Sequence, residues 1–204
     1  MKNKHEVRVH LGAVEFRKAG EGDGDGLGTL EGYAAVYDSP SEDLGGFVEV
    51  VARGAFARAL GDDAEEVLAY ADHDPARRLG RTGNGSLRLS DDERGLKVEI
   101  DLPNTSTGRD MAEEVRTGLV RGMSFGFRVI KDKWEERAEG GYLRTLLDVD
   151  LAEVSAVGVP AYPDTTLAKR GLEEFRARVV SPAPAPSFEE WRRLAMQKLR
   201  LARG

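Results

Sequence analysis

Three short stretches of the sequence carry side chains that together could hydrolyse an amide or ester bond. These stretches are residues 71–75 (ADHDP), 122–127 (GMSFGF) and 151–155 (LAEVS). They supply an imidazole at His73, a hydroxyl at Ser124 and a carboxylate at Glu153, which are the three groups of a serine hydrolase. An imidazole suits the base because its ordinary pKa lies nearest neutrality. The other two histidines, His5 and His10, lie near the N-terminus, so His73 is the expected base.

The identity of the carboxylate is the least constrained part of this set. Glu153 lies between apolar neighbours and would need a partner if it were buried, so we rank it first. Asp148 and Asp150 are the alternatives. Asp72 and Asp74 adjoin the histidine, but neighbouring side chains on an extended segment point apart. Each of the three groups also has a structural explanation: a turn histidine, a small residue at a strand entry, and a carboxylate facing water.

The residues around Ser124 could stabilise an oxyanion. Glycines on either side would let the backbone approach a substrate and leave amide groups free to donate. We expect the backbone amides from Gly122 to Phe125 to act in this way, with Arg121 or Arg128 supporting the oxyanion or contacting substrate. The alternative for the two arginines is a solvated position at the ends of a strand. The segment lacks the Gly-Xaa-Ser-Xaa-Gly pattern of the α/β-hydrolase elbow.

The composition excludes several classes of protein. The chain has 204 residues, of which 40% are hydrophobic and 32% charged, with a formal net charge of −6. A mildly acidic chain argues against general binding to nucleic acid, and no apolar run is long enough to cross a membrane. The sequence contains no cysteine, so thiolate chemistry is excluded, and one internal histidine makes a zinc site improbable. We therefore expect no metal and no cofactor.

Apolar alternation predicts a set of short strands. The segments that show it are residues 6–16 (one edge strand, bulged near Gly12), 29–37, 67–71, 96–102, 125–129, 142–150 and 153–157. The polar stretch 131–141 is typical of a hairpin tip. Residues 54–60 have helical character.

One amphipathic helix is predicted after Pro103. Thr107 would cap its start, and Gly118 would end it. Apolar side chains at positions 111, 115 and 119 would form the buried stripe of this helix. Many strands with few helices indicate an α+β fold that is mainly β, a β-barrel or strongly curved sheet with helices packed around it.

The domain organisation follows from composition. Residues 1–170 form the expected domain, in which the glycine-rich stretch 20–28 is a mobile loop. A Pro/Ala-rich linker region covers 171–186, and residues 187–204 form a tail helix that is basic and amphipathic.

From about residue 32 to residue 168 the chain resembles the prohead, or capsid-maturation, serine proteases of tailed bacteriophages. The stretches that carry the resemblance are GYAAVY (32–37), FVEVVARGAF (47–56), HDP (73–75), DLPNT (101–105), VRGMSFGF (120–127), EVSAV (153–157) and PAY (160–162). The resemblance implies a fold related to the herpesvirus assembly protease, a β-barrel surrounded by helices. It places the nucleophile at Ser124, the base at His73 and the third member at Glu153.

The resemblance also implies a role. Such a protease cleaves the scaffold, or the scaffold-like part of the major capsid protein, and then itself, inside the procapsid in the host bacterial cytoplasm. Its expected partners are those two proteins and further copies of the chain, with no nucleic acid and no membrane. The tail fits a targeting or self-processed segment by its composition. The alternatives are a non-catalytic capsid-assembly or scaffold-binding protein that retains the fold, and a metal-dependent hydrolase.

Overall fold

The computed structural model describes residues 5–10, 12, 14–19, 26–62, 64–158, 172–173 and 175–176. Contacts divide the chain into two units, residues 1–170 and 171–204. In the second unit the described residues are helical. The expected linker and tail helix lie outside the described residues, apart from those four positions, and so does most of the expected loop 20–28. The first unit is described below.

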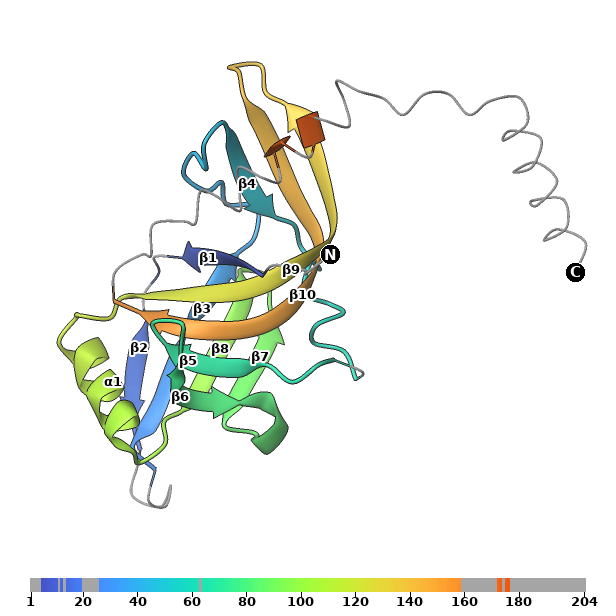
Figure 1. Ribbon diagram of the computed structural model, residues 1–204. Coiled ribbons are helices and arrows are strands. Elements are labelled where there is room, and N and C mark those ends of the chain that lie inside the picture. Colours follow the sequence, from blue (N-terminus) through green and yellow to red (C-terminus); the bar gives the residue numbers. More distant parts are fainter. Residues whose placement is uncertain are drawn as a thin grey trace, which may run out of the picture. The chain divides into compact units, whose positions relative to one another are not determined.

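The strands of the first unit form two sheets (Figure 1). The larger sheet has the order β1 (Glu6–His10), β9 (Gly122–Glu136), β10 (Tyr142–Val157), β5 (Leu68–Ala71) and β6 (Asp74–Arg81), and β4 (Phe47–Val51) also pairs with β10. The smaller sheet has the order β2 (Glu15–Lys18), β3 (Gly28–Val36), β8 (Gly95–Asp101) and β7 (Leu87–Asp91). A 3-10 turn, η1 (Thr82–Asn84), and one α-helix, α1 (Ser106–Arg116), complete the described elements of this unit.

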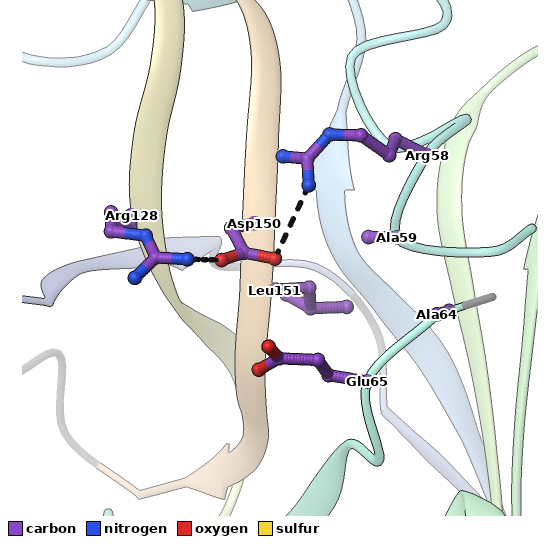
Figure 2. A pocket seen from close by; sticks show the side chains of 7 residues that line it. All are labelled: Arg58, Ala59, Ala64, Glu65, Arg128, Asp150 and Leu151. Atoms are coloured by element: carbon purple, nitrogen blue, oxygen red, sulfur yellow. Dashed lines mark hydrogen bonds and ion pairs between the residues drawn. The ribbon is translucent and has the colours of Figure 1, made fainter.

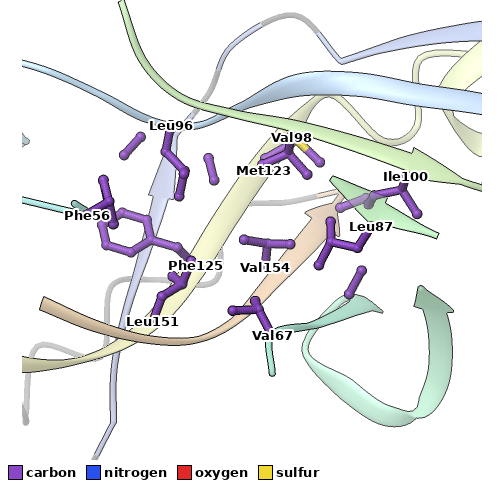
Figure 3. Packing of buried hydrophobic residues seen from close by; sticks show 14 of the residues in the cluster. Phe56, Val67, Leu87, Leu96, Val98, Ile100, Met123, Phe125, Leu151 and Val154 are labelled. Atoms are coloured by element: carbon purple, nitrogen blue, oxygen red, sulfur yellow. The ribbon is translucent and has the colours of Figure 1, made fainter. Parts of the chain in front are cut away.

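The core lies between apolar side chains of the two sheets. Figure 3 shows Phe125 and Val154 of the larger sheet beside Val98 and Ile100 of the smaller one. All four are at most 2% exposed. Because side chains alternate along a strand, one face of β9 and β10 enters this core, and the other face is left for polar groups.

Strand β10 organises the larger sheet. It pairs antiparallel with β9 and parallel with both β4 and β5. It is one long strand whose register with β9 shifts between Leu151 and Glu153, so the prediction of two separate strands at 142–150 and 153–157 is wrong. Strand β9 likewise continues to Glu136, which shortens the expected hairpin tip at 131–141.

Two other predicted elements differ from the structure. The segment 6–16 is not one bulged strand, because β1 pairs with β9 and β2 pairs with β3 in the other sheet. Residues 54–60 form a series of turns rather than a helix. Gly54 has φ of +79°, which no α-helix contains, and the buried Phe56 ties the segment to the core instead.

The N-terminal cap of helix α1 lies two residues before the predicted one. Thr105 has an extended backbone, and its side-chain oxygen accepts a hydrogen bond from the amide of Gly108 at 3.2 Å. A Cβ on Gly108 would lie 2.0 Å from the carbonyl oxygen of Pro103, so this glycine lets the helix start against the preceding loop. Thr107 lies inside the helix, whereas Gly118 follows its end with φ of +76°, as predicted.

The mainly β character of the fold is confirmed, but the barrel with surrounding helices is not. Backbone pairing places the strands in two sheets, and in the described part of the first unit α1 is the only α-helix, packed against β2 and β6. Among the described residues, no helix has the length and hydropathy needed to span a membrane.

Candidate active site

His73 is carried by a tight turn directly after β5. Both Asp72 and His73 have left-handed backbone conformations, with φ of 49° and 60°. The amide of Asp72 donates to the carbonyl of Ala156 at 3.0 Å, and its carboxylate accepts from the amide of Gly158 at 3.2 Å and from Arg77 at 2.9 Å. These bonds hold the strained turn against the end of β10, and they direct the histidine back over the sheet.

The side chains of the three predicted residues meet in one chain of hydrogen bonds. The Oγ of Ser124 lies 2.7 Å from Nε2 of His73, and Nδ1 of His73 lies 2.8 Å from Oε1 of Glu153. An ionised carboxylate can accept hydrogen bonds but cannot donate them. The bond to Glu153 therefore places the proton of neutral His73 on Nδ1. Nε2 is then free to accept the hydrogen bond from the hydroxyl of Ser124. Ser124 comes from β9, Glu153 from β10, and the histidine from the turn after β5.

The four aspartates considered for the third position have other partners. Asp148 accepts from Arg58 at 3.2 Å, and the carboxylate of Asp74 accepts from the backbone amide of Ala76. Asp150 forms an ion pair with Arg128. The carboxylate of Asp72 accepts hydrogen bonds from Gly158 and Arg77 and so stabilises the turn. Of the candidates weighed from sequence, only Glu153 contacts the imidazole in the described structure.

Comparison with known proteins assigns the chain to a family. The family model described as caudovirus prohead serine protease matches residues 13–178. The chain belongs to this family. It is 30% identical over 160 residues to the prohead protease of Enterobacteria phage HK97, covering 75% of this chain and 67% of that relative. It is 26% identical over 158 residues to the prohead protease of Escherichia phage T5, covering 78% and 70%.

A solved structure, that of the bacteriophage T4 capsid assembly protease, covers 76% of this chain and 99% of its own, with a TM-score of 0.49 and 13% identity. Membership of the prohead protease family, shown by the family model and the two sequence relatives, supports a serine protease of phage capsid maturation.

In this member of the prohead protease family, the strand amides near the serine are already used. Ser124 is fully buried and pairs with Val9 of β1 on one side and Ser155 of β10 on the other. Residues 123–127 have strands on both sides, so their amides donate within the sheet. The ring of Phe125 stacks on Phe127 in the core. This pairing disfavours the expectation of an oxyanion role for the amides of Met123, Ser124 and Phe125, and it does not cover the amide of Gly122.

The two arginines near the serine differ in their surroundings. Arg128 makes an ion pair with Asp150, which Arg58 also approaches at 3.6 Å (Figure 2). These groups line a small cavity of about 160 Å³ together with Glu65 and others. Arg128 is four residues from Ser124 along β9, a span of about 13 Å, so it does not reach the hydroxyl.

Arg121 precedes β9 and has an exposed side chain. Its backbone amide donates to the carbonyl of Val157 at 3.3 Å, which fixes its position at the end of β10. Within the described part of the chain, its guanidinium has no hydrogen bond or ion pair.

The contacts of Ser155 and Gly126 with Glu153 were not expected from the sequence. Ser155 donates a hydrogen bond to Oε2 of Glu153 at 2.6 Å. Gly126 faces the same carboxylate, and a Cβ there would lie 2.6 Å from Oε1. The spacing of Glu153 and Ser155 is the available signal for the first, because residues i and i+2 of a strand share a face. The described residues contain no group of three His, Cys, Asp or Glu side chains arranged to hold a metal ion.

Proposed function

We propose that this chain is a serine endopeptidase in which Ser124 is the nucleophile, His73 the general base and Glu153 the residue that orients the base. The observation that carries the proposal is the hydrogen-bonded series Ser124–His73–Glu153 in a member of the prohead serine protease family. A non-catalytic scaffold-binding protein would have no need of that geometry.

The chemistry follows from the two hydrogen bonds. Ser124 Oγ attacks the scissile carbonyl while Nε2 of His73 takes its proton. The ionised Glu153 stabilises the imidazolium that forms. The imidazolium then gives the proton to the leaving amine, which departs and leaves an acyl-enzyme. A water molecule, deprotonated by His73, hydrolyses the acyl-enzyme and restores the serine.

The oxyanion requires a donor that the sheet does not already use. Arg121 lies three residues before Ser124 and has an exposed guanidinium, so it is our candidate for this role. Arg128 is committed to Asp150 and is assigned to the cavity wall instead.

The proposed substrates are the scaffold, or the scaffold-like part of the major capsid protein, followed by the protease itself. The names of the relatives from phages HK97 and T5 support action on the prohead. The chain would act inside the procapsid in the host bacterial cytoplasm, and it would associate with the capsid protein and with other copies of itself. The tail from residue 187 would direct it there or be removed by self-cleavage.

Co-expression tests this function. The chain is produced with the major capsid protein of its own phage, and the intact mass of the capsid protein is measured. We expect truncation with the unaltered chain and with Ser90→Ala, a control serine exposed on β7 of the other sheet. Ser124→Ala should leave the capsid protein at full length. Cleavage at the unaltered rate by Ser124→Ala would overturn the proposal.

A further inference from the structure

The carboxylate of Glu153 occupies a seat formed by two residues that do not touch the imidazole. We propose that Ser155 and Gly126 are positioning residues for the reaction, which hold the Glu153 carboxylate where it accepts from His73. This inference rests on the proposed function and deepens it.

Ser155 fixes the rotation of the carboxylate. Oε1 of Glu153 accepts from His73 at 2.8 Å, and Oε2 accepts from the hydroxyl of Ser155 at 2.6 Å. A carboxylate held through one oxygen can turn about its terminal bond, whereas two donors on different oxygens define its plane. Ser155 is 0% exposed, so its hydroxyl has no access to bulk water and is directed to this acceptor.

Gly126 provides the space into which the carboxylate fits. It is the partner of Glu153 across β9 and β10. A Cβ at this position would lie 2.6 Å from Oε1 and 3.0 Å from Cγ of Glu153. Gly126 is not among the residues with a positive φ, so its backbone would accept any residue. The space needed by Glu153, rather than the backbone conformation, accounts for the glycine.

Ser155 is not a second nucleophile. It is the cross-strand partner of Ser124, so both hydroxyls lie on the same face of the sheet. However, Nε2 of His73 contacts Ser124, and the hydroxyl of Ser155 donates to Glu153. The imidazole of His73 therefore serves Ser124, and Ser155 acts through the carboxylate of Glu153.

The rate at which the full chain cleaves a capsid-derived peptide tests whether Ser155 and Gly126 position the carboxylate of Glu153. We expect Ser155→Ala and Gly126→Ala each to lower kcat by roughly ten- to a hundredfold with little change in KM, because a small misplacement of a catalytic group has an effect of this size. In the Glu153→Gln background, Ser155→Ala should cause almost no further loss. A residue that only supports the fold would give effects that multiply, and such a result would contradict the proposal.

A second measurement does not depend on proteolysis. The proton on Nδ1 of His73 should give a low-field NMR signal that shifts or broadens in Ser155→Ala and stays unchanged in Ser90→Ala. If this shift is seen but the unaltered chain cleaves nothing, the positioning of Glu153 by Ser155 is supported and the proposed function fails. If the chain cleaves its substrate but Ser155→Ala has an unaltered kcat and an unaltered NMR signal, Ser155 does not position Glu153 and the inference is wrong.

Discussion

At the scale of single residues, the site depends on a histidine that lies in a turn between two strands and not within a strand. His73 reaches Ser124 because it and Asp72 adopt left-handed conformations after β5. Such conformations cost on the order of 1–3 kcal/mol each for residues other than glycine. Asp72 offsets part of this cost through its bonds to the end of β10 and to Arg77.

Removal of either reacting group should abolish cleavage. We expect Ser124→Ala and His73→Ala to lower kcat/KM by roughly a thousandfold or more, because nucleophile and base act as a unit. Glu153→Gln should lose less, since the imidazole keeps one hydrogen-bonding partner. Peptide cleavage assays give the rates, and circular dichroism should show an unchanged fold. Measurable turnover by His73→Ala at the unaltered rate would argue against the assigned base.

The two arginines near the serine form a matched pair for a second test. Arg121→Ala should lower kcat by roughly a hundredfold if its guanidinium meets the oxyanion, as removal of such a donor does elsewhere. Arg128→Ala should leave kcat near its original value and lower thermal stability, because Asp150 loses its closest partner. Equal kcat values for the two variants would remove Arg121 from the mechanism.

The sequence predicts residues of this site only where a motif names them. His73, Ser124 and Glu153 stand in recognisable stretches, and the structure brings them together. Ser155 and Gly126 act through the register between β9 and β10, which no local pattern specifies.

At the scale of elements, a buried network of ion pairs fastens the edge strand β1 beside the serine strand. Arg8 of β1 bonds Glu49 of β4 at 2.7 Å, and Arg144 of β10 bonds the same glutamate at 3.1 Å. Arg144 also bonds Glu6 of β1 at 2.9 Å. Arg8, Glu49 and Arg144 are each at most 8% exposed. Loss of one partner from such a buried pair costs about 3–5 kcal/mol.

This network predicts a pH dependence of stability. Burial alone would raise the pKa of Glu6, but hydrogen bonds and charge from Arg144 and Arg8 outweigh it and lower that pKa below its usual value. The stabilisation by Glu6 is therefore present above the ordinary glutamate pKa of about 4.3 and is lost as the pH falls through the lower folded-state value. Thermal melting of the unaltered chain should show this loss as the pH falls below the ordinary glutamate pKa.

The Glu6→Gln variant is the control for that prediction. It should be less stable at neutral pH, and its stability should fall less steeply in the acid range than that of the unaltered chain. If the melting temperatures of the two proteins change in the same way with pH over the whole range, Glu6 does not contribute to the pH dependence of stability.

Helix α1 offers a comparison of two threonines. Thr105→Ala should lower the free energy of unfolding by about 1 kcal/mol, because the amide of Gly108 loses its acceptor. Thr107→Ala, inside the helix, should change it by less than about 0.5 kcal/mol. Urea unfolding of both variants measures the difference. A larger effect at Thr107 would restore the cap predicted from sequence.

Local patterns were sufficient for β3, β5 and β8 and for the end of α1. They missed β4, β6 and β7, and they failed where the pairing of distant segments decides the structure. The pattern at 6–16 does not reveal that β1 and β2 join different sheets. The pattern at 142–157 does not reveal that one bent strand serves β9, β4 and β5 together. The sequence of a segment can indicate that it forms a strand, but the strands that it pairs with depend on the whole fold.

At the scale of the molecule, we predict that residues 171–204 are dispensable for chemistry. A chain ending at Arg170 should cleave a capsid-derived peptide at about the unaltered rate, because all three proposed catalytic residues lie before that point. The same chain should be absent from purified procapsids if the basic tail is needed for recruitment. An unfolded or inactive product would show instead that the tail belongs to the core.

The parallel pairing of β5 with β10 has a consequence for the time at which the site appears during synthesis. Leu68 pairs with Glu153, and the amide of Asp72 donates to Ala156, so the turn that carries His73 is bound to the last described strand of the first unit. Contacts between segments this far apart in the chain form late, because the intervening loop must close first. A nascent chain on the ribosome therefore has no assembled Ser–His–Glu series until Val157 has been made. Translation itself therefore sets the earliest time at which the proposed Ser–His–Glu series can act.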